Sequence, residues 1–151
     1  MAVYSFQNVV ATVTGPGGFA SLGEGSASAK EGITIEQVED SNIMTIGADG
    51  AGMHSLIVTT ASTVTARLLK TSPINAILQA MFNLQTASSL LHGQNVITIT
   101  DIARGDTITA IGGAFKKPPS LTWASEGGIN EWIWDCIQTV RVLGIGQPSI
   151  V

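Results

Sequence analysis

The chain has 151 residues, a length typical of one compact domain. Only 12% of its residues are charged and 44% are apolar, against about 25% charged in an ordinary soluble domain. The net charge of −4 argues against a protein that binds the phosphate backbone of nucleic acids. Thr, Ser, Gly and Asn also interrupt every apolar stretch before it reaches the roughly 18 residues of a membrane-spanning helix. We therefore expect much of the uncharged surface to be buried against other subunits.

The N-terminal region shows no basic stretch followed by an apolar core, so we expect no secretory signal and synthesis in a cytoplasm. Cys136 is the single cysteine, which excludes an internal disulfide and fits a reducing compartment.

The first predicted element is a strand from Val9 to Thr14, which ends at Gly15-Pro16-Gly17-Gly18. The following segment, 15–32, is rich in Gly, Ser and Ala and is longer than the ~12 to 15 residues of most structureless loops. We interpret it as a flexible arm that docks on another subunit. The arm residues expected to make this contact are Gly15, Phe19, Leu22, Glu24 and Lys30.

Alternation of Ile with Thr and Glu predicts a hairpin from Ile33 to Gly47, with its turn at Glu39-Asp40-Ser41-Asn42. After a glycine-rich break, two further strands are predicted from His54 to Thr60 and from Thr63 to Leu69.

One amphipathic helix is predicted after these strands. Ser72 can cap it and Pro73 suits its first position. Apolar residues at helical spacing continue until Gly93, which gives a helix of about 19 residues. The face expected to lie on the sheet carries Ile77, Met81 and Phe82.

The C-terminal third is again predicted to be β. Val96 to Thr100 and Asp106 to Ile111 form a hairpin, and Lys116-Lys117-Pro118-Pro119 excludes a central strand beyond it. The last strand, Asn130 to Val142, is so long that we expect it to bend around a corner. Its predicted core face carries Trp132, Trp134, Cys136, Val140 and Val142. The sequence thus predicts one domain over 1–151, mainly β, as a sandwich or barrel with one helix whose apolar face lies on a sheet.

No residue pattern indicates catalysis, a metal site or a cofactor. His54 and His92 lack the spacing of a helical zinc site, and Cys136 lies on an apolar strand face without a cationic neighbour. The glycine-rich stretch 47–52 lacks the order of a phosphate-binding loop. Arg104-Gly105-Asp106 suits a hairpin turn. We therefore expect a structural protein and not an enzyme.

Four stretches together resemble the tail tube proteins of contractile-tailed bacteriophages, in the branch with a short single-domain subunit. Their order and spacing match over roughly residues 3 to 143. The four stretches are Asn42 to Gly50, Val64 to Asn75, Gly105 to Pro119, and Glu131 to Trp134.

The resemblance implies a fold of two packed antiparallel sheets with one flanking helix. It also implies hexameric rings, stacked into a tube, in which one sheet of each subunit joins a continuous barrel around the lumen. It also implies a surrounding sheath protein, a tape measure protein during assembly, and baseplate and tail terminator proteins at the ends. Viral DNA would pass through without specific binding. The subunit would belong to the virion tail, after assembly in the host cytoplasm, and the arm 15–32 would dock between rings.

We expect the lumen wall to lack Lys and Arg, because positive groups would hold passing DNA. The residues assigned to that wall, opposite the isoleucines of the two hairpins, are Thr34, Glu36, Thr98, Thr100, Thr107 and Thr109. Two alternatives remain open: the secreted tube subunit of a type VI secretion system, and a monomeric β-sandwich binding module.

Overall fold

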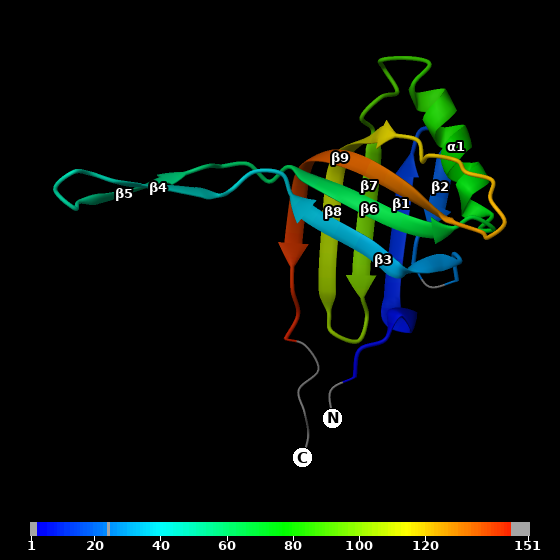
Figure 1. Cartoon of the computed structure of the whole chain (residues 1–151), viewed down its shortest axis with the longest axis horizontal. Coiled ribbons are helices and arrows are strands. Elements are labelled where there is room, and N and C mark those ends of the chain that lie inside the picture. The colour runs from blue at the N-terminus through cyan, green and yellow to red at the C-terminus, as the bar shows by residue number, and fades with distance from the viewer. Residues whose placement is uncertain (1–2, 24, 146–151) are drawn as a thin grey trace.

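The computed structural model describes residues 3–23 and 25–145 and shows a mainly β protein with one α-helix (Figure 1). A seven-stranded antiparallel sheet has the order β2-β1-β7-β8-β9-β6-β3, and β4 and β5 form a separate two-stranded sheet. The elements are η1 (Phe6–Asn8), β1 (Val9–Gly15), β2 (Gly18–Ser21), β3 (Ser28–Gln37), β4 (Asn42–Ile46), β5 (Gly52–Leu56), β6 (Ser62–Leu69), α1 (Ile74–Gln85), β7 (Asn95–Asp101), β8 (Asp106–Lys117) and β9 (Ile129–Val142). The expected fold class is confirmed. Among the described residues, no helix is long and apolar enough to cross a membrane.

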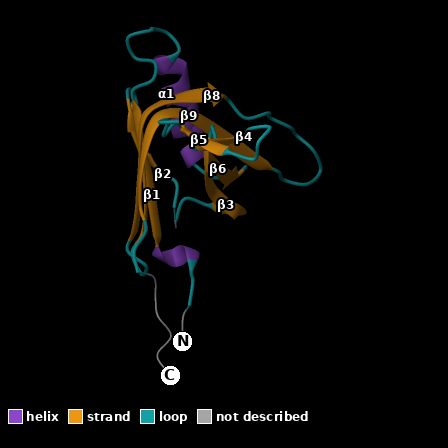
Figure 2. Ribbon diagram, turned by 90° about the vertical axis from the view of Figure 1, so that its left-hand side faces the viewer, coloured by secondary structure: helices purple, strands orange, loops and turns teal. Residues whose placement is uncertain are grey.

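The large sheet curls on itself to make two layers. Figure 2 shows β1 and β2 on one side and β3 and β6 on the other, with the long strands β8 and β9 passing from one layer to the other. Both long strands bend where Gly112, at φ +68°, lies against Ile137. On β9 the neighbours Ile137 and Gln138 are both exposed, so the alternation of buried and exposed positions shifts by one residue.

This shift corrects the expected face of the last strand. Trp132, Trp134 and Cys136 are buried as the alternation predicts. Beyond the bend, Thr139 is buried in their place, while Val140 and Val142 are 49% and 57% exposed. The expectation that both valines share the core face is therefore wrong.

An aromatic cluster occupies the space between the layers, below α1. The Phe115 ring packs edge-on against Phe82 and Trp132, with ring centroids 5.8 Å apart in both pairs, and at 5.3 Å from Trp134. Trp132, Trp134 and Met81 are fully or almost fully buried, and Phe82 packs on this core at its edge.

Helix α1 is shorter than the sequence predicts and lies at the top of the curled sheet in Figure 1. The Ser72 hydroxyl accepts a hydrogen bond from the Ile74 N–H at 3.3 Å, so it caps the first turn. Leu78 is fully buried, whereas Ile77, which was expected in the core, is 39% exposed. The predicted extension to Gly93 is instead a series of turns, in which Leu90 is 83% exposed.

A buried pair of amides fixes the end of α1. Gln85 Nε2 donates to Asn95 Oδ1 at 2.8 Å, and Asn95 Nδ2 donates back to Gln85 Oε1 at 2.7 Å. Gln85 Nε2 also donates to the carbonyl oxygen of Pro16 at 3.0 Å. These bonds connect the helix, the start of β7 and the turn between β1 and β2.

Two predicted strand pairings differ from the structure. β3 pairs with β6, far along the chain, so the predicted hairpin from Ile33 to Gly47 is wrong. β4 pairs with β5 instead, from Asn42↔Leu56 to Ile46↔Gly52. The hairpin of β7 with β8 is confirmed.

Candidate functional site: the exposed hairpin and two outer faces

The β4–β5 hairpin extends away from the rest of the molecule (Figure 1). At its tip the Gly47 N–H donates to the Ala51 carbonyl oxygen at 2.7 Å, and Gly50 adopts φ +88°, a conformation that favours glycine. The Asp49 carboxylate accepts from the Ala51 N–H at 3.1 Å. The tip is thus a well-formed turn, although no other part of the described chain packs on the hairpin strands.

The hairpin strands expose an unusual amount of apolar surface. Exposed fractions of their large apolar side chains are Ile43 53%, Met44 62%, Ile46 57%, Met53 59% and Leu56 78%. An isolated two-stranded hairpin is at best marginally stable in water, and contiguous exposed apolar surface marks an interaction site. The hairpin therefore has the composition of an element that is completed by contact with another molecule.

One outer face of the sheet, which we call the threonine face, carries no charge. Its residues are direct cross-strand partners on β1, β7, β8 and the end of β9, in the rows Thr12↔Thr98↔Thr109↔Val140, Val10↔Thr100↔Thr107↔Val142 and Thr14↔Val96. Partners in such rows point to the same side of a sheet. Val10, Val140 and Val142 are about half exposed, at 48%, 49% and 57%.

The outer face of the other layer, which we call the charged face, has a different composition. Its rows on β3, β6, β9 and the end of β8 are Glu36↔Thr63↔Asp135, Thr34↔Thr65↔Ile133↔Lys117 and Arg67↔Glu131. Arg67 donates to the Thr34 hydroxyl at 3.0 Å and lies 3.4 Å from a Glu131 carboxylate oxygen.

The six residues assigned to the lumen wall therefore divide between two faces. Thr98, Thr100, Thr107 and Thr109 belong to the threonine face, and the other two to the charged face. The reason for assigning Thr34 and Glu36, a wall without cations, does not hold, because Arg67 shares their face and touches Thr34. The alternation within each strand was predicted correctly. Which strands become neighbours could not be predicted where they are far apart in sequence.

The segment 15–32 is folded where the structure describes it. β2 pairs with β1 from Thr12↔Ser21 to Gly15↔Gly18, and Leu22 is fully buried. The backbone of Gly15 is so close to Asn95 that an added Cβ would lie 2.0 Å from Asn95 Oδ1. Phe19 is 72% exposed and Lys30 is exposed, while Glu24 lies outside the described residues. Small residues at positions 15–32 thus permit close packing against β1, where we had expected a flexible arm.

The cysteine, histidine and aspartate side chains that could take part in catalysis have structural roles where they lie. Burial, and then the negative charge of Asp135, raises the pKa of the Cys136 thiol to about 11, so the thiol stays protonated at neutral pH. His54 Nδ1 is 3.1 Å from the Asn42 side-chain nitrogen on the exposed hairpin. Asp101 accepts from the N–H groups of Ala103 and Arg104 and so closes the β7–β8 turn.

A cavity of about 470 Å³ lies between the two layers, at the open end of the curled sheet. Its walls include Ile33 and Ile35 of β3 and Ile99 and Ile108 of the opposite layer. A carboxylate at its rim, Asp106, accepts the Gly144 N–H at 2.9 Å. The rim carboxylate therefore holds the chain beyond β9.

Comparison with known proteins identifies the family of the chain. The family described as bacteriophage PhiTE tail tube protein matches residues 1–144. The chain belongs to this tail tube family. The family consists of structural tail proteins and is not an enzyme family, and membership places the chain in a phage tail or a related contractile particle.

Solved structures of tube-related proteins share the fold of this tail tube protein. The cap that terminates the tube of the anti-feeding prophage has a TM-score of 0.54 at 11% identity and covers 95% of each chain. The sheath/tube terminator of the extracellular contractile injection system PVC has a TM-score of 0.56 at 12% identity, covering 94% of this chain and 98% of that one. A chain of the PVC sheath-tube complex gives 0.54 at 10% identity, over 93% and 92%. A comparison with curated proteins found no match.

Proposed function

We propose that this chain forms hexameric rings which stack into the tail tube of a contractile-tailed phage and guide viral DNA into the host. The observation that carries the proposal is the exposed β4–β5 hairpin in a chain of the tail tube family. A subunit that leaves Ile43, Met44 and Met53 more than half exposed requires another subunit to cover them. A head-to-tail contact of this kind repeats, and so builds rings and stacks.

The threonine face suits a contact between proteins better than a wet channel. It lacks charged side chains, and half-exposed valines give it an apolar character that burial would stabilise. We infer that Thr98, Thr100, Thr107 and Thr109 lie against a neighbouring protein, either another subunit or the surrounding sheath.

The charged face is the better candidate for the lumen wall, with Thr34 and Glu36 retained there. Its cations are Arg67, which is neutralised by Glu131, and Lys117, at the last position of β8. The carboxylates of Glu36 and Asp135 would repel the phosphates of passing DNA. β3 is an edge strand of the sheet, so a neighbouring subunit can extend this layer by strand pairing. Sheet extension around a ring would close the wall.

Sheath, tape measure, baseplate and terminator proteins are the partners that this role requires. Segment 15–32 remains a candidate for a contact between rings through Phe19 and Lys30, which are exposed, and not through Leu22, which is buried. One PVC structure is a sheath-tube complex and the other a sheath/tube terminator, which supports sheath and terminator neighbours here.

Electron microscopy of the purified chain tests the proposal. We expect hollow tubes of uniform diameter whose end views have sixfold symmetry. Monodisperse monomers at high protein concentration would instead favour a β-sandwich binding module. Genes for a sheath and a tape measure beside this one would separate a phage tail from a type VI secretion system.

A further inference from the structure

One segment accounts for the whole net charge of the chain. Residues 33–66 contain Glu36, Glu39, Asp40 and Asp49 and no Lys or Arg, which gives −4. The other acidic residues number 11 − 4 = 7 and balance the 7 Lys and Arg, all of which lie outside the segment. The fold places most of this segment in and beside the hairpin, so an acidic extension projects from a body of zero net charge.

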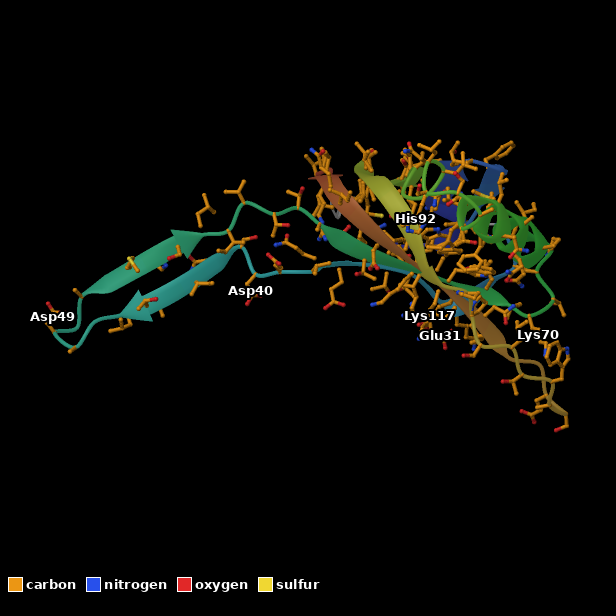
Figure 3. All side chains as sticks on the ribbon, turned by 90° about the horizontal axis from the view of Figure 1, so that it is seen from above. Glu31, Asp40, Asp49, Lys70, His92 and Lys117 are labelled. Carbon is orange, nitrogen blue, oxygen red and sulfur yellow. The ribbon has the colours of Figure 1, made fainter. Side chains whose placement is uncertain are left out.

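Along the charged face, the charge changes sign with distance from the hairpin. The row nearest the hairpin contains Glu36 and Asp135, and the next contains Lys117. Arg67 follows further along β6, and Lys70 lies just beyond the end of that strand. Figure 3 shows Asp40 and Asp49 along the hairpin, and Lys70 and Lys117 on the body. The hairpin end of this face is therefore acidic, whereas the body carries Lys70 and Lys117 together with the acidic Glu31 and Glu131.

Two of the basic residues of the body have no partner among the described carboxylates. Arg67 is paired with Glu131, and Lys70 donates to the Thr122 carbonyl oxygen and lies 4.8 Å from the centre of the Trp123 ring. Lys116 and Lys117 are exposed at the end of β8, and neither is within ion-pair distance of a described carboxylate. They are free to bind an acidic partner.

A cleft at the base of the hairpin has the chemistry to receive a lysine. It is about 370 Å³ in volume and is lined by Val38, Glu39, Asp40, Ile43 and Ile57. The three apolar side chains can pack on the methylene chain of a lysine, and the two carboxylates can bind its ammonium group. Neither carboxylate forms an ion pair within the described part of the subunit.

We propose that the Glu39 and Asp40 cleft of one copy binds the Lys116-Lys117 end of β8 in the next copy, and that this pairing sets the head-to-tail polarity of the stack. The inference rests on the proposed tube function. A cleft and a lysine pair on different parts of one chain make a heterologous contact, which repeats without closing along a stack. Two copies meeting acidic end to acidic end would be repelled, so wrong polarity is disfavoured as well.

Charge reversal with rescue tests the pairing. Asp40→Lys and Lys117→Glu are made separately and together, and the critical concentration for tube formation is measured by sedimentation at low and high salt. Glu126→Lys is the matched control, because it makes the same charge change on an exposed acidic residue outside the hairpin, in the loop between β8 and β9. Each single variant should raise the critical concentration roughly fivefold or more at low salt, and the double variant should recover most of that loss. Glu126→Lys should change it about twofold at most.

Three results would overturn the proposal. If the single reversals have no more effect than Glu126→Lys, or the double variant shows no recovery, the cleft and the lysines do not meet although tubes form, and the proposed function stands. If Lys117→Glu tubes assemble normally but no longer retain DNA, the lysines serve nucleic acid instead. If the unaltered chain forms no tubes at any salt, the proposed function fails together with this inference.

Discussion

The buried amide pair of Gln85 and Asn95 gives a quantitative test of how α1 is attached to the sheet. Asn95→Ala removes both bonds between the amides and leaves Gln85 Oε1 without a partner at a site that is 1% exposed. Gln85 Nε2 keeps only its bond to the Pro16 carbonyl oxygen. A buried polar group without a partner costs about 1 to 3 kcal/mol, and the small cavity adds about 1 kcal/mol. We expect the free energy of unfolding to fall by about 2 to 4 kcal/mol.

A double-mutant cycle separates this hydrogen-bond effect from simple loss of packing. Gln85→Met, Asn95→Leu and the double variant are compared by urea denaturation at concentrations below tube formation, followed by circular dichroism. Replacing both partners by apolar groups of similar shape costs far less than stranding one of them. The double variant should therefore be at least about 1 kcal/mol more stable than the sum of the single effects allows. Additive effects, or a cost for Asn95→Ala below about 0.5 kcal/mol, would refute the reasoning.

The remaining predictions concern the helix, the cysteine and the lumen wall. Leu78→Ala should destabilise the subunit by about 2 to 5 kcal/mol and Ile77→Ala by less than about 1.5, because only Leu78 is fully buried; equal losses in urea titration would contradict the helix orientation. The raised pKa of Cys136, about 11, keeps the thiol protonated in the fold. The contribution of this thiol to the free energy of unfolding should therefore be constant below the ordinary pKa of 9.0 and be lost as pH rises from about 9 to 11. Cys136→Ala should remove that decrease, and a native thiol that reacts rapidly with a thiol reagent at pH 8 would oppose the assignment. Glu36→Lys should leave assembly intact but slow DNA ejection at low salt, where phosphate contacts are strongest; unchanged ejection rates would place Glu36 outside the lumen.

Local sequence patterns predicted the strands whose alternation is regular. The strands from Val9, Thr63, Val96 and Asp106 begin within one residue of the predicted positions, because Ile, Val and Thr alternate there without interruption. The aromatic core could also be predicted, since Trp132 and Trp134 follow the same alternation. The exchange of the buried and exposed faces of β9 after Ile137 could not be predicted, because the bend that causes it is imposed by Gly112 on the neighbouring strand.

Long-range pairing decides what local patterns cannot. Ile33 and Ile43 begin similar alternating runs, which predict a hairpin between them, yet the first run pairs with β6. The second run forms the projecting hairpin, whose apolar residues have no core to face. A signal for that hairpin exists in the tight turn around Asp49-Gly50, flanked by strands of equal length. The arm expected at 15–32 was inferred from composition alone, and small residues also serve close packing.

The most direct test of the central claim is the sedimentation of a chain in which residues 42–56 are replaced by an Asn-Gly turn between Ser41 and Ile57. The Ile57 N–H bonds the Ser41 carbonyl oxygen at 2.9 Å, so a two-residue turn can close the shortened stem. The account predicts a folded monomer with the urea midpoint of the full chain and no tubes at any concentration that assembles the unaltered protein. Normal tubes from the shortened chain would contradict the claim that the hairpin builds the assembly.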